Sequence, residues 1–400
     1  MNEFERIKLG DVGQIITGKT PLTKVPSYYD GTIHFVSPAD LNGCDKNILY
    51  TAKTISNSGL QSIKGCILPK GTICVSCIGN LGYVGITTME CASNQQINSI
   101  IVDESRYDLD YIYYAIKHLW RYFKSQENQS TTISIINKST FSNIEIYSPS
   151  LETQRKIASI LSTLDDKIAV NRKICENLEA QAQALFKHWF IDFAPFKDGK
   201  FVESELGMIP EGWRVGTLGE IVELKKISVK PLVGIVYKHY SIPAFDNSKN
   251  PSNDEGSSIK SSKFGISNNA VLLSKLNPTT KRIWYVGDVT DNSVSSTEFL
   301  PFYAKNSHYT PFVYCYLNSN KIYREIANGA KGTTNSHQRI DANSILSRTL
   351  AFSEEIISDF CKCTLPMMEK ILQTEQESAR LSTLRDIILP KLMSGQIKLN

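Results

Sequence analysis

The sequence lacks the long apolar runs that membrane proteins carry: none approaches the ~20 residues that a membrane-spanning helix needs. The first ten residues, MNEFERIKLG, are charged and contain no apolar core, so we expect no secretory signal. Nine cysteines, an odd number without regular spacing, favour reduced thiols over a disulfide framework. These absences predict a protein of the cytoplasm.

The sequence also lacks a convincing metal site or set of catalytic residues. Its six histidines are scattered, and none has the spacing of metal ligands or of a nucleophile with its base. Cys74 and Cys77 form a single C-x-x-C, and Cys361 with Cys363 does not add a second pair at zinc-finger spacing. Because residues three apart point to opposite faces of a strand, we expect Cys74 and Cys77 to pack in a core.

Three short motifs suggest enzymes, but each lacks its context. GQIITGKT (13–20) matches a phosphate-binding loop, yet Pro21 and Pro26 follow where that loop requires a helix. Asn277-Pro278-Thr279-Thr280 resembles the start of the N-P-P-[YF] motif of amino-methyltransferases, without the second proline and the aromatic residue. Glu223-Leu-Lys225 fits half of a nuclease site, and no aspartate pairs with it convincingly. We therefore predict no catalytic residues and no metal site in this chain.

The net charge of +4 is unevenly distributed along the 400 residues, a length that suggests two or three domains. Residues 208–350 carry 17 Lys and Arg against 11 Asp and Glu, whereas residues 1–150 carry 13 of each. A basic region indicates a polyanionic partner there, although a merely basic surface explains the charge equally well.

The residues after 150 predict a long helix with one apolar seam. Apolar residues recur at alternating steps of four and three over more than four heptads, as in a coiled coil. At 1.5 Å per residue, a helix from about 152 to 190 would be roughly 55–60 Å long. Such a helix needs a partner, and the seam repeats 203 positions later. The seam residues are Ile157, Leu161, Leu164, Ile168, Leu178 and Leu185, and then Phe360, Met367, Ile371, Leu381 and Ile388.

Other features support a duplicated chain. KLGDVGQIITGKTP near the start has a weak echo in TLGEIVELKKISVKP after Trp213. Each half therefore predicts a mixed domain of short strands and turns, followed by a long helix. FAPFKDGKFVESELGMIPEGW is turn-rich and predicts the junction. Pro366 should kink the second helix or delay its regular start.

Several polar, turn-rich segments are suited to reading a DNA groove. Asn and Gln can pair with adenine and Arg with guanine, while Lys and backbone amides hold phosphates. Solvated surface loops are the alternative for any single residue. The candidates in the first half are Lys19, Thr20, Asn80, Asn94, Gln95, Gln96, Gln129 and Thr131. Those in the second half are Lys275, Asn277, Thr279, Thr280, Lys281, Arg282, Lys331, Thr333, His337, Gln338 and Arg339.

In order along the chain, five blocks resemble the specificity subunit of Type I restriction–modification systems. Two blocks look like conserved frames inside the recognition domains: LPKGTICVSCIGNLGYVGI with NQQI, and LLSKLNPTTKRIWYV. The family's central conserved helix resembles PSLETQRKIASILSTLDDKIAVNRKICENLEAQAQALFKHWFIDF, and its entry to the second recognition domain resembles SELGMIPEGWRVGTLGEI. Its C-terminal conserved segment resembles LSTLRDIILPKLMSGQIKL.

The resemblance implies an α+β fold with two target recognition domains, at 1–150 and 208–350. It also implies a central conserved helix with a linker at 151–207 and a C-terminal conserved helix at 351–400, which pack as an antiparallel coiled coil with pseudo-two-fold symmetry. Such a chain reads a split target on double-stranded DNA, with the coiled coil setting the gap. It binds two methyltransferase subunits and restriction–motor subunits.

In this family S-adenosylmethionine, ATP and Mg belong to the partner subunits, so we expect no cofactor in this chain. The alternatives are a stand-alone DNA methyltransferase or NTPase, and a structural coiled-coil protein that does not bind DNA. Binding of S-adenosylmethionine or ATP by the isolated chain would favour the first. The basic charge of 208–350 and its polar loops argue against the second.

Overall fold

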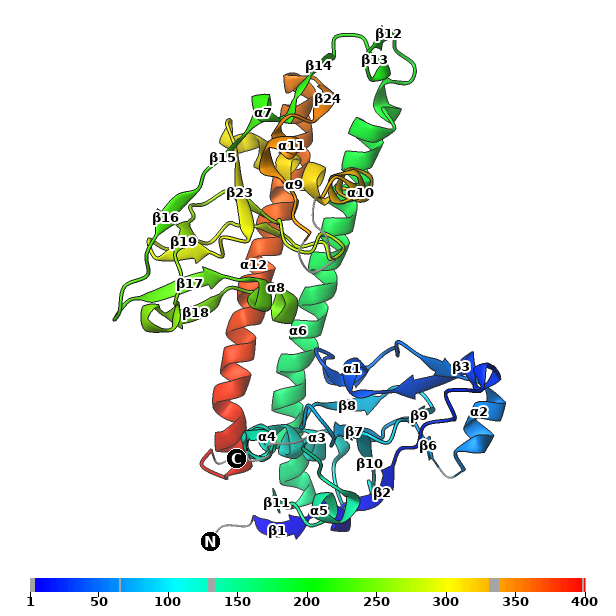
Figure 1. The fold of residues 1–400 in the computed structure, drawn as a ribbon. Coiled ribbons are helices and arrows are strands. Elements are labelled where there is room, and N and C mark those ends of the chain that lie inside the picture. The colour runs from blue at the N-terminus through cyan, green and yellow to red at the C-terminus, as the bar shows by residue number, and fades with distance from the viewer. Residues whose placement is uncertain (1–3, 65, 129–133, 331–337, 398, 400) are drawn as a thin grey trace. The chain divides into compact units, whose positions relative to one another are not determined.

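The computed structural model describes residues 4–64, 66–128, 134–330, 338–397 and 399. The chain forms two compact units: unit 1 contains residues 1–170 and 380–400, and unit 2 contains residues 171–379. The two longest helices, α6 (Leu151–Phe186) and α12 (Glu354–Met393), each contribute a segment to both units (Figure 1). The units therefore cut across the sequence-based domain ranges.

Unit 1 contains two main sheets and five short α-helices. Its strands are β1 (Glu5–Lys8), β2 (Gly13–Thr17), β3 (Tyr29–Val36), β4 (Asn47–Ile48), β5 (Thr54–Ile55), β6 (Ile67–Leu68), β7 (Ile73–Ser76), β8 (Val84–Thr87), β9 (Cys91–Ser93), β10 (Ile97–Val102) and β11 (Glu145–Ser148). Its short helices are η1 (Leu9–Asp11), η2 (Pro26–Tyr28), α1 (Pro38–Leu41), α2 (Asn57–Ser62), α3 (Leu109–His118), α4 (Trp120–Asn128) and α5 (Lys138–Ser142). The larger sheet has the order β2-β10-β7-β8-β4, and the smaller one β5-β3-β9-β6.

Unit 2 is also a mixed unit with two main sheets. Its strands are β12 (Phe201–Ser204), β13 (Gly207–Pro210), β14 (Arg214–Thr217), β15 (Val222–Leu224), β16 (Ile227–Val229), β17 (Val236–Tyr240), β18 (Ser252–Glu255), β19 (Lys263–Gly265), β20 (Ala270–Ser274), β21 (Ile283–Tyr285), β22 (Ser293–Ser295), β23 (Phe299–Ala304) and β24 (Thr349–Phe352). Its short helices are η3 (Lys187–Ile191), η4 (Ala194–Phe196), α7 (Leu218–Ile221), α8 (Ile242–Ser248), η5 (Gly256–Ser258), η6 (Ser307–Tyr309), α9 (Thr310–Asn318), α10 (Asn320–Asn328) and α11 (Ala342–Leu346). The two main sheets have the orders β15-β23-β20-β21 and β16-β19-β22-β17-β18.

The order of elements in unit 2 repeats that of unit 1. The sheet β2-β10-β7-β8 corresponds to β15-β23-β20-β21, and helices α3, α4 and α5 correspond to α9, α10 and α11. In both units the strand directly before the long helix pairs antiparallel with an early strand: β11 with β1, and β24 with β14, the strand that follows the β12–β13 hairpin. The fold prediction of two mixed domains, each followed by a long helix, is confirmed.

In each unit the long helices pack against a sheet and against one shorter helix, α3 in unit 1 and α9 in unit 2. In unit 1, Ile157 and Leu161 of α6 share a core with Tyr111 of α3 and with Leu389 of α12. In unit 2 the core is aromatic: Phe186 of α6 contacts Phe312 of α9 and Phe360 of α12, with ring centroids 5.8 and 6.0 Å apart. Full burial of one such side chain contributes roughly 1.5–3 kcal/mol, so these cores dominate the stability of each unit. Every predicted seam residue is buried or half-buried.

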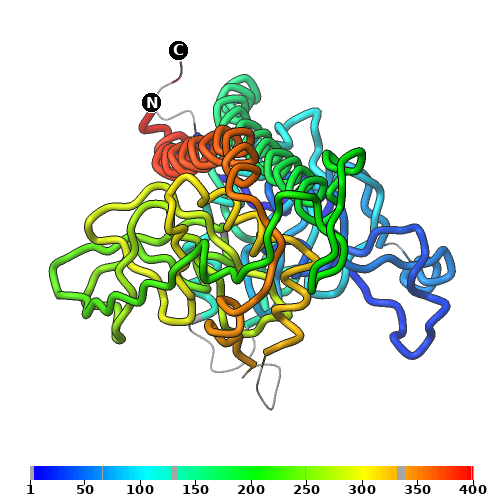
Figure 2. Tube along the Cα trace, turned by 90° about the horizontal axis from the view of Figure 1, so that it is seen from above, coloured from blue at the N-terminus to red at the C-terminus, as the bar shows by residue number. Residues whose placement is uncertain are grey.

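The helices α6 and α12 run antiparallel. In unit 2, Cys175 donates its thiol to the carbonyl of Ile371 at 3.8 Å, and Asn171 donates to Glu377 at 2.8 Å. In unit 1, Asp165 pairs with Arg385. The partner number on α12 rises as the number on α6 falls, as an antiparallel pair requires, and the coils run side by side in Figure 2.

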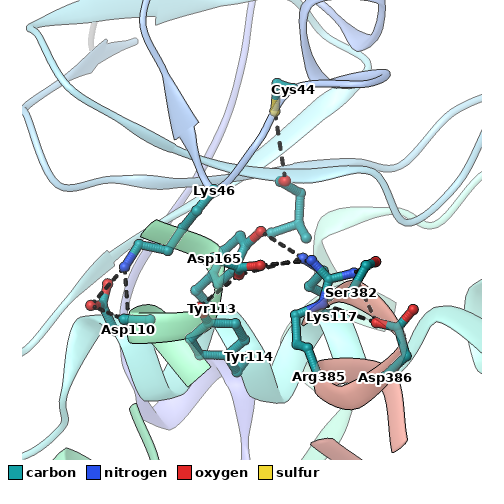
Figure 3. Close-up of polar contacts among 12 residues, drawn as sticks. Cys44, Lys46, Asp110, Tyr113, Tyr114, Lys117, Asp165, Ser382, Arg385 and Asp386 are labelled. Atoms are coloured by element: carbon teal, nitrogen blue, oxygen red, sulfur yellow. Dashed lines mark hydrogen bonds and ion pairs between the residues drawn. The ribbon is translucent and has the colours of Figure 1, made fainter. Parts of the chain in front are cut away.

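A buried polar network holds α3, α6 and α12 together in unit 1 (Figure 3). The carboxylate of Asp165, which is 9% exposed, accepts from Arg385 Nη1 at 2.6 Å and from the Tyr114 hydroxyl at 2.7 Å. Lys117 Nζ lies 3.8 Å from the same carboxylate. Burial lowers the pKa of the Lys117 ammonium, while Asp165 opposes that shift. Beside this group, Lys46 donates to Asp110 at 2.8 Å.

The positions related to this network by the repeat are apolar. A shift of 203 carries Asp165 to Met368, and the reverse shift carries Arg385 to Ala182. Met368 and Ala182 are 1% and 0% exposed within the apolar core of unit 2. The same place along the helix pair thus holds an ion pair in unit 1 and only apolar side chains in unit 2.

One sequence-based expectation, a delayed start of the second helix, needs correction. Pro366 does not delay the second helix, because α12 begins at Glu354, twelve residues earlier, and is assigned as helix through Pro366. Pro366 and Lys362 are both exposed, so water can reach the helix face where the Lys362 carbonyl loses its N–H partner. The turn-rich junction contains a hairpin, β12 with β13, and Trp213 beyond this hairpin packs against Phe190, Phe193 and Phe196 before it. Within the described part of the chain, every helix is too short or too polar to cross a membrane.

Candidate nucleic-acid interface

In unit 1, the described candidates gather at one end of the larger sheet. The chain leaves β2 at Lys19, whose backbone N–H donates to the carbonyl of Ser93 at 2.9 Å. The hydroxyl of Thr20 then hydrogen-bonds the side-chain amide of Gln95. Gln96 anchors the next connection, because its carbonyl accepts from the N–H of Cys77 at 2.7 Å.

The loop between β7 and β8 is bridged to the segment before α5. The N–H of Gly79 donates to the carbonyl of Ser134 at 3.0 Å, and the N–H of Ile136 donates to the carbonyl of Cys77 at 2.8 Å. Helix α4 packs against this loop: its Phe123 lies so close to Gly82 that a Cβ added to Gly82 would be 2.7 Å from the Cβ of Phe123. Asn80 is exposed at the tip of the loop. We call this pair of bridged segments loop pair 1.

Unit 2 builds the same arrangement from the loop between β20 and β21 and the segment before α11, which we call loop pair 2. The N–H of Asn277 donates to the carbonyl of Gln338 at 3.1 Å, and the N–H of Ile340 donates to the carbonyl of Lys275 at 2.9 Å. Asn277 has φ +49°, at the position where loop pair 1 has Gly79 with φ +78°. Asn tolerates this left-handed conformation better than most residues, which explains its place here.

Loop pair 2 rests on α10 as loop pair 1 rests on α4. The hydroxyl of Tyr323 donates to the carbonyl of Pro278 at 3.1 Å. Lys281 donates to the carbonyl of Asn318 and to Oδ1 of Asn320, both at 2.9 Å, and burial lowers the pKa of its ammonium. In both loop pairs the fold therefore holds the described backbone by hydrogen bonds between the two segments and by contacts with α4 or α10.

The candidates of loop pair 2 differ in how free their side chains are. Thr279 and Thr280 are exposed. Arg339 is exposed and lies against Glu298, with its Nε and Nη2 each 3.2 Å from the carboxylate. Arg282, in contrast, is 8% exposed, and its Nε and Nη2 donate to Asp246 at 2.6 and 2.8 Å. The guanidinium of Arg282 is thus engaged inside the unit. Five further candidates lie outside the described residues: Gln129, Thr131, Lys331, Thr333 and His337.

The structure adds polar residues that the sequence reading missed. A hollow of about 630 Å³ beside loop pair 2 is lined by Thr279 and Gln338 and by Asn320, Arg324 and Asn328 of α10. The last three recur every four residues, and this spacing places them on one face of a helix. That periodicity is the signal by which the sequence could have identified them.

The motifs that suggested enzymes have structural explanations. Gly13–Thr17 is strand β2, and the chain after it continues into η2 (Pro26–Tyr28) and β3 in place of the α-helix that follows a phosphate-binding loop. Cys74 and Cys77 are buried in different apolar clusters, as their spacing predicted, and burial raises the pKa of both thiols to about 12. Lys225 Nζ pairs with Glu223 at 2.7 Å. Among the described residues, no group of three or more His, Cys, Asp or Glu side chains could hold a metal ion.

Comparisons with known proteins find relatives of this chain. A family model described as the Type I restriction modification DNA specificity domain matches residues 1–180. The MjaIX specificity subunit of Methanocaldococcus jannaschii is 32% identical over 98% of this chain and 93% of its own length. The HindI specificity subunit of Haemophilus influenzae is 34% identical over 43% of this chain and 39% of its own length. The crystal structure of a Type I S subunit from M. genitalium has the same fold, with a TM-score of 0.55 at 17% identity, covering 99% of this chain and 97% of that one.

Proposed function

Since the chain belongs to the family of Type I restriction–modification specificity subunits, we propose that each compact unit reads one half of a split DNA target. The observation that carries this proposal is the duplication of the loop pairs. In each unit, two equivalent backbone hydrogen bonds bridge the loop pair, an equivalent helix (α4 or α10) packs against it, and a long helix follows it. A fixed backbone with exposed polar side chains is what reading of base edges requires.

Charge supports double-stranded DNA as the partner. Residues 208–350, which include loop pair 2, carry six more basic than acidic residues. Lysines there would hold phosphates, and Gln338, Arg339 and the α10 residues would face base edges. In unit 1 the neutral polar side chains of Asn80 and Gln95 would face base edges, in a region whose basic and acidic residues are equal in number.

The long helices would set the gap between the half-sites and recruit partner subunits. Outside the shared seam, α6 exposes Val170 (51%) and α12 exposes Leu384 (46%) and Ile387 (52%). Exposed apolar side chains on an otherwise polar helix surface are suited to contact with helices of another subunit. We propose that two methyltransferase subunits and the restriction–motor subunits bind this chain in the cytoplasm. They would supply S-adenosylmethionine, ATP and Mg, and this chain itself would have no catalytic role.

Sequencing of modified adenines tests the proposal. Cells with the gene should show one split motif that cells without it lack. Gln338→Ala should relax a base preference in only one half of that motif, and Gln95→Ala in only the other. Each loss should be worth ~1–3 kcal/mol if the contact is bidentate.

Two results would contradict the proposal. One is an unchanged set of modified sites after loss of the gene. The other is a variant in one loop pair that alters both halves equally. Binding of S-adenosylmethionine or ATP by the isolated chain would favour the stand-alone enzyme instead.

A further inference from the structure

Both units expose a leucine in the stretch of chain that follows β2 in unit 1 and the corresponding strand β15, together with the short β16, in unit 2. Unit 1 presents Leu22 after Pro21, and unit 2 presents Leu232 and Val233 after Pro231. Leu22 is 69% exposed, Leu232 58% and Val233 82%. Single exposed apolar side chains are common on protein surfaces, but here a Pro-Leu pair occurs in the corresponding connection of both units. We call these two turns the Pro-Leu tips.

The fold holds both Pro-Leu tips in a fixed shape. In unit 1 the N–H of Val25 donates to the carbonyl of Leu22 at 3.1 Å, and the hydroxyl of Tyr29 donates to the carbonyl of Pro21 at 2.6 Å. In unit 2 the N–H of Ile235 donates to the carbonyl of Leu232 at 3.4 Å.

A tyrosine fixes the second tip as well. The Tyr237 hydroxyl accepts from the N–H of Leu232 at 3.1 Å. Gly256 packs so closely on the same residue that a Cβ there would lie 2.0 Å from the Leu232 carbonyl oxygen. Proline fixes φ just before each leucine. The backbone of each tip is therefore held by hydrogen bonds, and its apolar side chains are exposed on that turn.

Lysines lie close to both tips along the chain: Lys19 and Lys24 in unit 1, and four lysines within residues 224–245 in unit 2. Of those four, Lys225 pairs with Glu223 and Lys238 with Asp288, and Glu255 pairs across from Val236 next to the second tip. Lys24, Lys226 and Lys230 are exposed.

From this combination we infer that the Pro-Leu tips are DNA wedges. Resting on the proposed function, the inference adds that each tip places its leucine against a base-pair step flanking the half-site while its lysines contact the phosphates on either side. Double-stranded DNA is the partner that offers closely spaced negative charge together with apolar base faces. A protein partner would have to match the lysines with carboxylates around an apolar pocket.

Such a wedge acts without reading sequence. It unstacks a base step and lets the duplex follow more of the protein surface, so it adds affinity and distortion outside the recognised bases. Two tips of the same kind would act symmetrically on the two half-sites.

Fluorescence of 2-aminopurine placed at successive positions flanking each half-site tests the wedges, because unstacking raises its emission. The full-length chain in its complex with the partner subunits is titrated into duplexes that carry the motif found by methylation sequencing. Leu22→Ala should abolish the rise at one flank and Leu232→Ala at the other. Each should weaken binding by about tenfold, the scale expected for loss of a buried leucine. The modified motif should stay the same.

Three comparisons make the test decisive. Leu206→Ala removes a leucine of similar exposure (45%) from the junction and should have no effect. Leu22→Met should restore both fluorescence and affinity. Lys24→Ala should flatten the salt dependence of binding by about one counterion per phosphate contact, whereas Leu22→Ala should leave that slope unchanged.

Unchanged affinity and unchanged fluorescence in both leucine variants would overturn the wedge. Loss of complex assembly with normal DNA binding would assign the tips to a protein partner and would also overturn it. Failure of the proposed function is distinguishable, because then the wild-type complex itself would not bind the motif.

Discussion

Glu375 of α12 shows how burial next to other charges tunes a single residue. Burial raises the pKa of its carboxyl to about 7, Glu179 of α6 adds to that shift, and Lys249 opposes it. Lys249 Nζ itself lies 3.6 Å from the carboxylate of Glu179. Unit 2 thus carries two carboxyl groups and one ammonium where α8 meets the helix pair, and one of the carboxyl groups takes up a proton near neutral pH.

This shift predicts a pH dependence of stability. Between pH 4.5 and about 7 the folded state keeps a proton on Glu375 that the unfolded chain releases, so the free energy of unfolding falls as pH rises through this window. Glu375→Gln should match the wild type at pH 5 and exceed it at pH 8 by roughly 2 kcal/mol. Urea unfolding at both pH values measures the difference. Parallel pH profiles for the two proteins would contradict the prediction.

Arg282 illustrates a cation whose role the fold decides. Its guanidinium is buried and makes two hydrogen bonds to Asp246, whereas the neighbouring Lys281 is half-buried on loop pair 2. We expect Arg282→Ala to lower the free energy of unfolding by about 2 kcal/mol, the scale of hydrogen bonds between charged groups. Lys281→Ala is the matched control and should affect DNA binding more than unfolding. Equal stability of the two variants would refute this division of roles.

At the scale of elements, the helix pair owes its alignment to the Asp165–Arg385 ion pair as well as to its apolar seam. Removing one partner of a buried pair leaves an uncompensated charge, which typically costs 3–5 kcal/mol. We therefore expect Asp165→Met alone to destabilise unit 1 by about 3 kcal/mol. The double variant Asp165→Met with Arg385→Ala copies the apolar residues of the related positions and should recover most of that loss. Chemical unfolding of the two single variants and the double variant measures the coupling, and simple additivity would refute it.

What the sequence predicted well at this scale depends on periodicity. The 3.5-residue seam predicted α6 and α12, and the echo around Leu9 and Leu218 predicted the duplication. The loop pairs could not be predicted in the same way, because their bridges join residues such as Gly79 and Ser134 that are far apart in the chain. Buried polar groups such as Asp165 were also missed, because an acidic residue beside an apolar seam has the same pattern whether its partner is water or an arginine.

At the scale of the whole molecule, the proposed role of the helices as a spacer predicts that the gap follows their length. Seven residues preserve the heptad register and add about 10 Å, close to three base pairs at about 3.4 Å each. Seven-residue insertions after both Asn171 and Gln376 keep each side of the antiparallel pair in register. Methylation sequencing should then show the same two half-sites with a gap about three base pairs longer. An altered half-site at an unchanged gap would show that the helices do not set it.

The repeat-related positions of the helix pair hold an ion pair in unit 1, Asp165 with Arg385, and apolar residues in unit 2, Met368 and Ala182. This difference bears on which long helices could pair between two copies of the chain. If α6 of one copy of the chain lay antiparallel to α6 of a second copy, Asp165 would face Ala182, and its carboxylate would lose the arginine that neutralises it. In the same way, two α12 helices would set Arg385 against Met368, with a guanidinium in an apolar environment. A pairing of like halves would therefore carry the cost of a buried charge without its partner. If copies or fragments of the chain exchanged halves, the ion pair would favour combinations of one first half with one second half.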